Sequence, residues 1–207
     1  MPDSDLQVES SGEPTGELSG DSDEFDSLRR RVLWAMPTGL FVVGSRSGDR
    51  RNLMTANWVM QVATTPKLVA VAVESDSLTR ELIEAGGSFS VSLLARSERG
   101  LVRRFVKPVR DMDVDDRGAA TTLQGESVFE VAHGLPCLSA GVGWLACSVL
   151  SVQGWDVGKD TDSASHVLVV GEVVDAGESD RLAAAGADDA TDDAVLSMRD
   201  TRMNYGG

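Results

Sequence analysis

The chain has 207 residues, of which 42% are hydrophobic, and its 19 basic and 33 acidic residues give a net charge of −14. This length suits one domain with a complete core and flanking tails. The negative charge argues against nucleic acid or an anionic membrane as a partner. No apolar run reaches the roughly 20 residues that cross a bilayer, and the acidic N-terminus does not resemble a signal peptide, so we expect a cytoplasmic protein.

The acidity itself has a simple physical interpretation. Only three lysines are present, and aspartate is dense in both tails, which indicates adaptation to high salt, that is, a halophilic protein. At about 1 M salt, charges are screened within about 3 Å, so the acidity need not mark a binding surface.

Cysteine and histidine are scarce. Cys137 and Cys147 are too few for a disulfide framework and match no metal spacing, so we predict two buried thiols and no metal site. The sequence contains neither a P-loop nor a dinucleotide glycine fingerprint. With only His133 and His166, a hydrolytic triad is poorly supported, and His133 is expected to be structural.

The first third of the chain predicts a tail, a helix and a strand. Residues 1–24 are acidic and nearly free of large apolar side chains, so we expect a disordered tail. Residues 25–36 have helical apolar spacing, and Pro37-Thr38-Gly39 ends this helix. A strand at 40–44 then leads into a polar turn at 45–51.

The central third alternates strands and helices. We predict strands at 53–63 and 68–73, separated by a break at Thr64–Lys67. A helix at 77–85 ends at Gly86-Gly87, and a strand follows at 89–94. Residues 97–106 predict a helix with Leu101, Val102 and Phe105 inward and Arg99, Arg103 and Arg104 outward.

The last part returns to strands. Residues 111–126 lack periodicity and predict a loop or lid. Strands follow at 137–140, 143–155 and 166–175. Residues 177–194 are either a solvated helix or an insertion, and 195–207 form a polar arm with four candidate anchors: Leu196, Met198, Met203 and Tyr205. Antiparallel-compatible strands with few helices favour a small barrel over a doubly wound parallel sheet.

Two segments carry candidate chemistry. Asn52–Trp58 places small amide and hydroxyl side chains on a strand, which by composition fits an edge strand as well as a binding wall. Glu74–Arg80 brings three hydroxyls and an arginine to a helix start, where backbone N–H groups favour an anion such as phosphate.

Several motifs together resemble the flavin reductase family of FMN-binding split barrels. They are Pro37–Val43, Met54–Trp58, Pro66–Val73, Phe89–Leu94 and His166–Val173, with a looser Met203–Tyr205 ending. Ser92 and Ser165 depart from the asparagine and aspartate that the family often has. The resemblance implies a mainly β, antiparallel, Greek-key-like split barrel over residues 25–176, followed by an acidic segment and C-terminal arm at 177–207.

The resemblance also implies a flavin mononucleotide (FMN) site. The ring edge would lie against Thr55–Trp58 and the phosphate near Ser75, Ser77, Thr79 and Arg80, while His166 would border a nicotinamide pocket. Arg103, Arg104 and Lys107 are further candidates for the phosphate, although a solvated face is the commoner role for such residues. The full predicted cofactor set is Thr38, Asn52, Met54, Thr55, Ala56, Asn57, Trp58, Ser75, Ser77, Thr79, Arg80 and Ser92.

The implied activity is hydride transfer from NADH or NADPH to flavin, with FMN as bound cofactor or as released substrate. The implied assembly is a homodimer, with Met203–Tyr205 crossing to the partner. Trp58, Trp144 and Trp155 are expected in the core or at an interface, and the core is the favoured placement. Two alternatives stay open: a non-catalytic, flavoredoxin-like carrier that receives electrons from a redox protein partner, and a flavin-free dimeric scaffold. The sequence does not distinguish NADH from NADPH or identify the final electron acceptor.

Overall fold

The computed structural model describes residues 23–155, 164–185 and 195–201. The chain divides into two compact units, one of residues 1–36 with 205–207 and one of residues 37–204. The predicted disordered tail lies almost wholly outside the described residues. Among the described residues, no helix is both long and apolar enough to span a membrane.

Helix α1 (Asp23–Ala35) is the described part of the first unit and confirms the predicted N-terminal helix within two residues. Asp26 forms ion pairs with Arg29 and Arg30, which follow it by three and four positions, about one helical turn, and such pairs stabilise a helix modestly. Its large apolar side chains, including Phe25 and Val32, are exposed. Among the described residues of this unit, the interactions that support the helix are therefore local ones.

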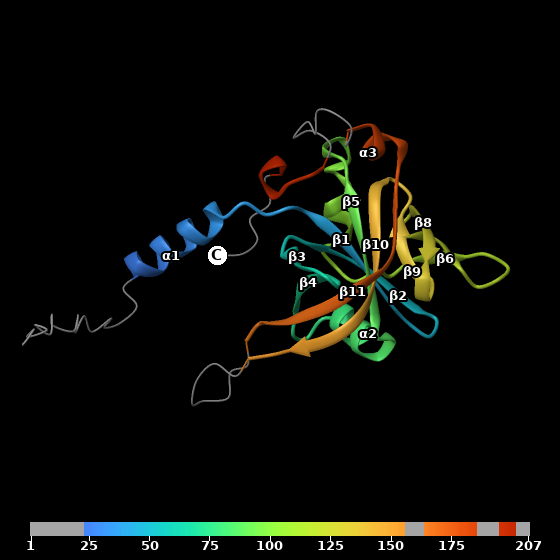
Figure 1. The fold of residues 1–207 in the computed structure, drawn as a ribbon, viewed down its shortest axis with the longest axis horizontal. Helices are drawn as coiled ribbons and strands as arrows, with labels where there is room; N and C mark the ends of the chain where they lie inside the picture. Colours follow the sequence, from blue (N-terminus) through green and yellow to red (C-terminus); the bar gives the residue numbers. More distant parts are fainter. Residues whose placement is uncertain (1–22, 156–163, 186–194, 202–207) are drawn as a thin grey trace, which may run out of the picture. The chain divides into compact units, whose positions relative to one another are not determined.

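The second unit is built on a seven-stranded antiparallel sheet in the order β2-β1-β5-β10-β11-β4-β3 (Figure 1). Its strands are β1 (Phe41–Ser47), β2 (Arg50–Ala56), β3 (Val59–Thr64), β4 (Lys67–Glu74), β5 (Ser88–Leu94), β10 (Gly141–Gln153) and β11 (His166–Glu178). Figure 1 shows β10 and β11 as a long hairpin. The architecture is the predicted mainly β split barrel with a few short helices.

The sheet curves because of one short connection. Strands β2 and β3 lie at opposite edges of the sheet, yet only Asn57 and Trp58 join them. Two extended residues span about 7 Å, so the two edges must meet at this corner. The prediction of one strand over 53–63 is therefore wrong: residues 53–56 pair with β1 and residues 59–64 with β4.

Helix α2 (Leu78–Gly86) has well-defined ends. Ser77 caps its N-terminus by accepting a hydrogen bond from the Arg80 backbone N–H. Gly87 follows its C-terminus with a φ of 68°, a left-handed conformation that favours glycine. Leu82 and Ile83 form the buried face of this helix, and the helix itself confirms the prediction.

A second, four-stranded sheet corrects the predicted loop or lid at 111–126. It contains β6 (Met112–Val114), β7 (Ala120–Leu123), β8 (Glu126–Val131) and β9 (Leu135–Leu138). The prediction was wrong because β6 is exposed on both faces and so shows no apolar alternation, although its backbone pairs with β7.

The predicted helix over 97–106 is instead two short 3₁₀ helices, η1 (Arg96–Glu98) and η2 (Leu101–Phe105). Gly100 lies between them, and glycine weakens a continuous helix. Val102 and Phe105 point inward as expected, because burial of these side chains does not require an α-helix.

Side chains that alternate along the strands pack into two hydrophobic cores. Val42 and Leu53 belong to a cluster that also contains Phe105 and Leu138, from η2 and β9. The neighbouring Val43 and the small Ala56 belong to the barrel interior, together with β4, β5 and β11 side chains. Successive residues of one strand thus serve opposite faces.

The C-terminal segment is partly described. Strand β11 extends to Glu178 and is followed by α3 (Asp180–Ala185), so the start of the predicted acidic segment is strand and short helix. Leu196 and Met198, the latter in η4 (Met198–Asp200), are buried anchors as predicted. Met203 and Tyr205 lie outside the described residues.

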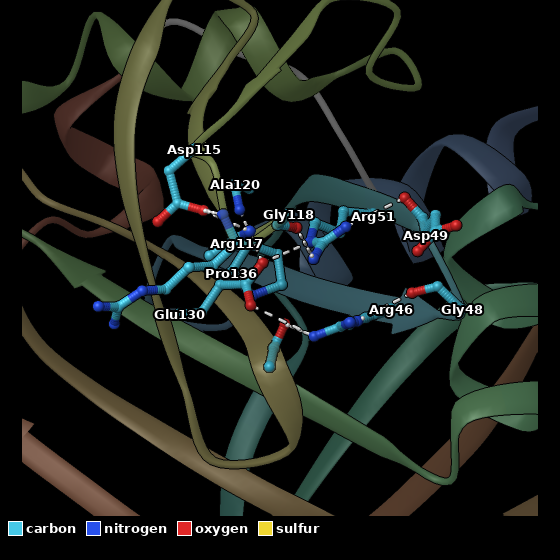
Figure 2. A network of polar contacts seen from close by, with 12 residues as sticks. Arg46, Gly48, Asp49, Arg51, Asp115, Arg117, Gly118, Ala120, Glu130 and Pro136 are labelled. Atoms are coloured by element: carbon cyan, nitrogen blue, oxygen red, sulfur yellow. Dashed lines mark hydrogen bonds and ion pairs between the residues drawn. The ribbon is translucent and has the colours of Figure 1, made fainter.

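An Arg–Glu cluster, made of Arg46, Arg51 and Glu130, ties the two sheets together (Figure 2). One Glu130 oxygen accepts from Arg51 Nε at 2.5 Å, and the other accepts from Arg46 at 3.2 Å. Arg51 also donates to the carbonyls of Asp49 and Gly118, and its side chain is 2% exposed. Every nitrogen of this buried guanidinium is thereby satisfied, as burial of a charge requires.

The tryptophans differ from expectation. Trp58 and Trp155 are 38% and 45% exposed, so their predicted core placement is wrong. Trp58 directly precedes β3, and Trp155 lies two residues after β10. Trp144 is half-buried and contacts Phe129 edge to face.

Candidate functional site

A pocket of about 290 Å³ lies where β2, the end of β4, the start of α2 and the segment after η2 converge. Four of the predicted cofactor residues line it: Asn52, Met54, Ser77 and Thr79. They come from the two segments, Asn52–Trp58 and Glu74–Arg80, that the sequence singled out. The pocket is at the lower end of the size range of small-molecule sites, so it suits one end of an extended ligand.

Asn52 forms the wall between β2 and α2. Its Nδ2 donates to Thr79 Oγ1 at 2.9 Å, and its Oδ1 accepts from the Val109 backbone N–H at 2.8 Å. Asn52 and Thr79 are both buried. Thr79 Oγ1 accepts a hydrogen bond from Asn52, so the Thr79 hydroxyl can donate its hydrogen to a ligand.

The start of α2 faces the same pocket. Ser77 Oγ donates to the Glu74 carbonyl at 2.8 Å while capping the helix, so this hydroxyl shapes the loop. The positive end of the helix dipole is thereby held at the pocket wall, which favours an anion.

Ser75 and Arg80 do not line the pocket. Ser75 Oγ donates to the Ala164 carbonyl at 2.7 Å. Arg80 donates to the Ser75 carbonyl at 2.6 Å and forms an ion pair with Glu84. Both therefore brace the loop between β4 and α2.

Three ionisable residues set the charge of the pocket. Glu74 and Asp76 contribute carboxylates and Lys107 an ammonium group. Of the three basic candidates predicted near η2, only Lys107 lines the pocket, and Arg104 is paired with Glu126 instead. An anionic ligand would gain from Lys107 and the helix start and lose from the two carboxylates.

The remaining predicted residues lie elsewhere. Thr55 Oγ1 donates to the Val102 carbonyl at 2.5 Å, on the other face of β2. Ser92 is buried and accepts from the Leu138 backbone N–H at 3.1 Å. Thr38 accepts a backbone hydrogen bond from Met198, while Ala56 and Asn57 are buried at the corner beside Trp58.

His166 begins β11 and pairs with Glu74, so it lies beside the strand end that borders the pocket. Its Nδ1 is 2.9 Å from Ser165 Oγ, and its ring meets Trp58 edge to face with centroids 4.9 Å apart. Burial lowers the pKa of His166 below its usual value, and the Glu74 carboxylate opposes this shift.

Sequence reasoning missed several pocket residues. The hydrophobic ones among them are Leu53, Leu78, Phe105, Val106 and Pro108. The two acidic ones, Glu74 and Asp76, flank the predicted serines and were thus within reach of the sequence. In the segment Phe105–Pro108 only Lys107 was a candidate, and its three neighbours carried no such signal, because only folding brings them to β2.

A second pocket, of about 310 Å³, is lined by the first residues of β3 and of β4 together with barrel side chains, and it is mostly apolar, with Gln61 and Lys67 as its polar lining residues. Phe41, Leu93 and Leu145 are on its walls, and the exposed Met60 is at its rim. A surface of this kind is typical of an interaction site.

The two thiols are buried, as predicted. Burial raises the pKa of Cys147 to about 12 and also raises that of Cys137. Neither thiol is therefore a nucleophile at neutral pH.

The chain is similar to several known proteins. It is 30% identical over 148 residues to the high molecular weight rubredoxin of Moorella thermoacetica, covering 70% of this chain and 58% of that protein. The chain thus spans less than two thirds of this relative.

Two solved structures share the fold at 26% identity and a TM-score of 0.56. One is the flavin reductase component of a bacterial two-component tryptophan halogenase, with 75% of this chain and 88% of that chain covered. The other is the NADH:FAD oxidoreductase of Streptomyces globisporus in complex with NAD and FAD fragments, with 77% and 85% covered. The family model described as flavin reductase like domain matches residues 33–194, which is most of this chain. The chain therefore belongs to the flavin reductase-like family.

Proposed function

We propose that the protein is an NAD(P)H-dependent flavin reductase whose flavin, FMN by preference, places its phosphate end in the pocket between β2 and α2. The observation that carries this proposal is the convergence of Asn52, Ser77, Thr79 and Lys107 on one pocket in a flavin reductase-like chain.

The residues present fit the polar end of a flavin. The α2 start and Lys107 supply positive potential, and Thr79 supplies a hydroxyl. In this proposal the small pocket would hold a phosphate and part of the ribityl chain, while the ring would extend toward the corner at Asn57 and Trp58. Bound flavin would supply the redox chemistry by accepting a hydride from the nicotinamide. The chain's own tasks are to bind, orient and leave one ring face accessible.

A homodimer forms part of the proposal. The apolar pocket beside β3 and β4 leaves large side chains such as Met60 exposed, and a second copy of the chain would cover them. Sedimentation of the purified protein tests this directly: a monomer at micromolar concentration would contradict it.

Flavin titration is the primary test. Quenching of FMN fluorescence, compared with FAD and with riboflavin, which lacks the phosphate, should show the order FMN above FAD above riboflavin. Equal affinity for FMN and riboflavin would contradict the phosphate placement, and no quenching by any of the three would contradict the flavin site itself.

A second candidate, an electron carrier, is favoured by the similarity to a rubredoxin-named protein. Anaerobic mixing of the flavin-loaded protein with NADH and with NADPH separates the two. Rapid bleaching of the flavin by either supports the reductase. Bleaching only by a reduced redox protein supports the carrier.

A further inference from the structure

An outward-facing aromatic pair lies beside the pocket. Along β4, Val69, Val71 and Val73 face the barrel interior, so Ala72 and Glu74 face outward. Trp58 accepts a hydrogen bond from the Ala72 backbone on one side, and β11 pairs with β4 on the other. Trp58 and His166 therefore flank the same strand end.

The two rings meet diagonally across β4. Trp58 lies opposite Ala72, and His166 lies opposite Glu74. Strands on either side of a third lie about 10 Å apart, and the two side chains bridge that separation, with 4.9 Å between ring centroids and 71° between planes. Such an edge-to-face contact fixes the tilt of the imidazole.

Ser165 contacts the imidazole of His166 at its Nδ1 atom. Its hydroxyl lies 2.9 Å from His166 Nδ1. The serine backbone is itself anchored, because its carbonyl accepts from the Ser75 N–H at 2.9 Å, and Ser75 Oγ holds the Ala164 carbonyl. With Nδ1 engaged, any hydrogen bond from His166 to a ligand uses Nε2.

We propose that Trp58 and Ser165 are positioning residues, which hold His166 in one tilt with Nδ1 turned toward Ser165, so that Nε2 meets the nicotinamide of the hydride donor. The proposal rests on the proposed reductase function. Serine is a neutral partner, so unlike a carboxylate it orients the ring without adding a negative charge that would stabilise the imidazolium. Burial also disfavours the imidazolium and lowers the pKa of His166, and the Glu74 carboxylate opposes this shift.

The chain offers a matched control. Ser148 lies 3.3 Å from Nε2 of the only other histidine, His133, and Phe129 and Trp144 form another edge-to-face pair. Ser148→Ala and Phe129→Leu therefore remove the same kinds of contact away from His166.

The experiment combines kinetics with imidazole ¹⁵N NMR on the flavin-loaded protein. We expect Ser165→Ala and Trp58→Leu each to lower kcat/KM for NADH about 3- to 10-fold, the size of one hydrogen bond or ring contact. In Ser165→Ala, flavin affinity should stay within about twofold of wild type. Trp58→Leu is assayed at saturating flavin, because the flavin ring is proposed to extend toward Trp58. Ser165→Thr and Trp58→Phe, which keep the hydroxyl and the ring, should restore kcat/KM, and both control variants should leave it unchanged.

The NMR readout separates positioning from a general loss of structure. Because the chain has two histidines, His166→Gln assigns both signals. Ser165→Ala should change the imidazole ¹⁵N shifts of His166 but not of His133, and Ser148→Ala the reverse. Wild-type His166 signals and wild-type kcat/KM in both Ser165→Ala and Trp58→Leu would overturn the proposal. A wild-type protein that binds flavin but ignores NADH and NADPH would instead overturn the reductase function, and the NMR comparison would still test the positioning.

Discussion

Arg51 and Asn52 are neighbours on β2, yet they serve opposite sides of the molecule. Arg51 enters the Arg–Glu cluster, where Glu130 and two backbone carbonyls satisfy its guanidinium (Figure 2). Asn52 faces α2 and lines the pocket. The cluster is closed and ties two sheets together, whereas the pocket keeps polar groups beside open space. We infer that the first side of β2 provides stability and the second provides binding.

Removing the charge of Glu130 should produce the largest effect. In Glu130→Gln the buried Arg51 charge loses its counter-ion, and breaking a buried pair in this way costs about 3–5 kcal/mol of unfolding free energy. Urea unfolding measures it. Glu81→Gln, which breaks the fully exposed pair with Arg50, is the control and should change stability little. If both variants are equally stable, the cluster is not a major source of stability.

Asn52→Ala should lower both the stability of the fold and the affinity for flavin. The Val109 N–H would lose its acceptor and Thr79 its donor, and a buried group left without a partner costs about 1–3 kcal/mol. We expect a stability loss in this range and at least about tenfold weaker flavin binding by fluorescence titration. Thr122→Ala, which removes an exposed contact with Asp113, should alter neither. Unchanged flavin affinity in Asn52→Ala would remove Asn52 from the site.

Substitutions of Ser77 separate capping from binding. Ser77→Ala should cost about 1 kcal/mol by loss of the helix cap, whereas Ser77→Asp keeps a capping oxygen and most of the stability. The added carboxylate should nevertheless repel the flavin phosphate. The expected pattern is thus a stable Ser77→Asp protein that binds FMN weakly but riboflavin normally. Tight FMN binding by this variant would place the phosphate elsewhere.

Charge substitutions should give smaller, opposite changes. Lys107→Ala should weaken FMN binding about threefold, and Asp76→Asn should strengthen it by a similar factor at low salt. About 1 M salt should remove most of both differences, because the charges are then screened. Changes that persist in high salt would indicate contacts other than charge.

The smallest effect concerns His166 and pH. Because its pKa in the folded protein is lowered, the unfolded chain takes up the proton first as pH falls through the usual imidazole range. His166 thus contributes stability that is present above this range and lost below it. His166→Gln, which has no such proton, should show a shallower loss of stability between pH 7 and pH 5 in parallel urea titrations; the same slope as wild type would contradict the shift.

The sequence by itself predicted the local elements whose signals are local. Ser77 and Gly87 bound α2, and the apolar runs of β4 and β11 indicate buried strands, because caps and side-chain alternation depend on neighbours along the chain. The resemblance to the family added the barrel and the segments of the site. The exposed β6 and the two short helices around Gly100 were not predicted, because pairing and tertiary packing decide them.

What only the tertiary structure decided is which side chains meet. Nothing in the order of residues brings Lys107 to Asn52 and Thr79, Glu130 to Arg51, or Trp58 to His166. Each meeting depends on the curvature of a sheet whose edges join at Asn57 and Trp58 and on the alternation that sends Arg51 and Asn52 to opposite faces. The sequence determines which residue types are available for the site, whereas long-range packing determines the distances between their side chains.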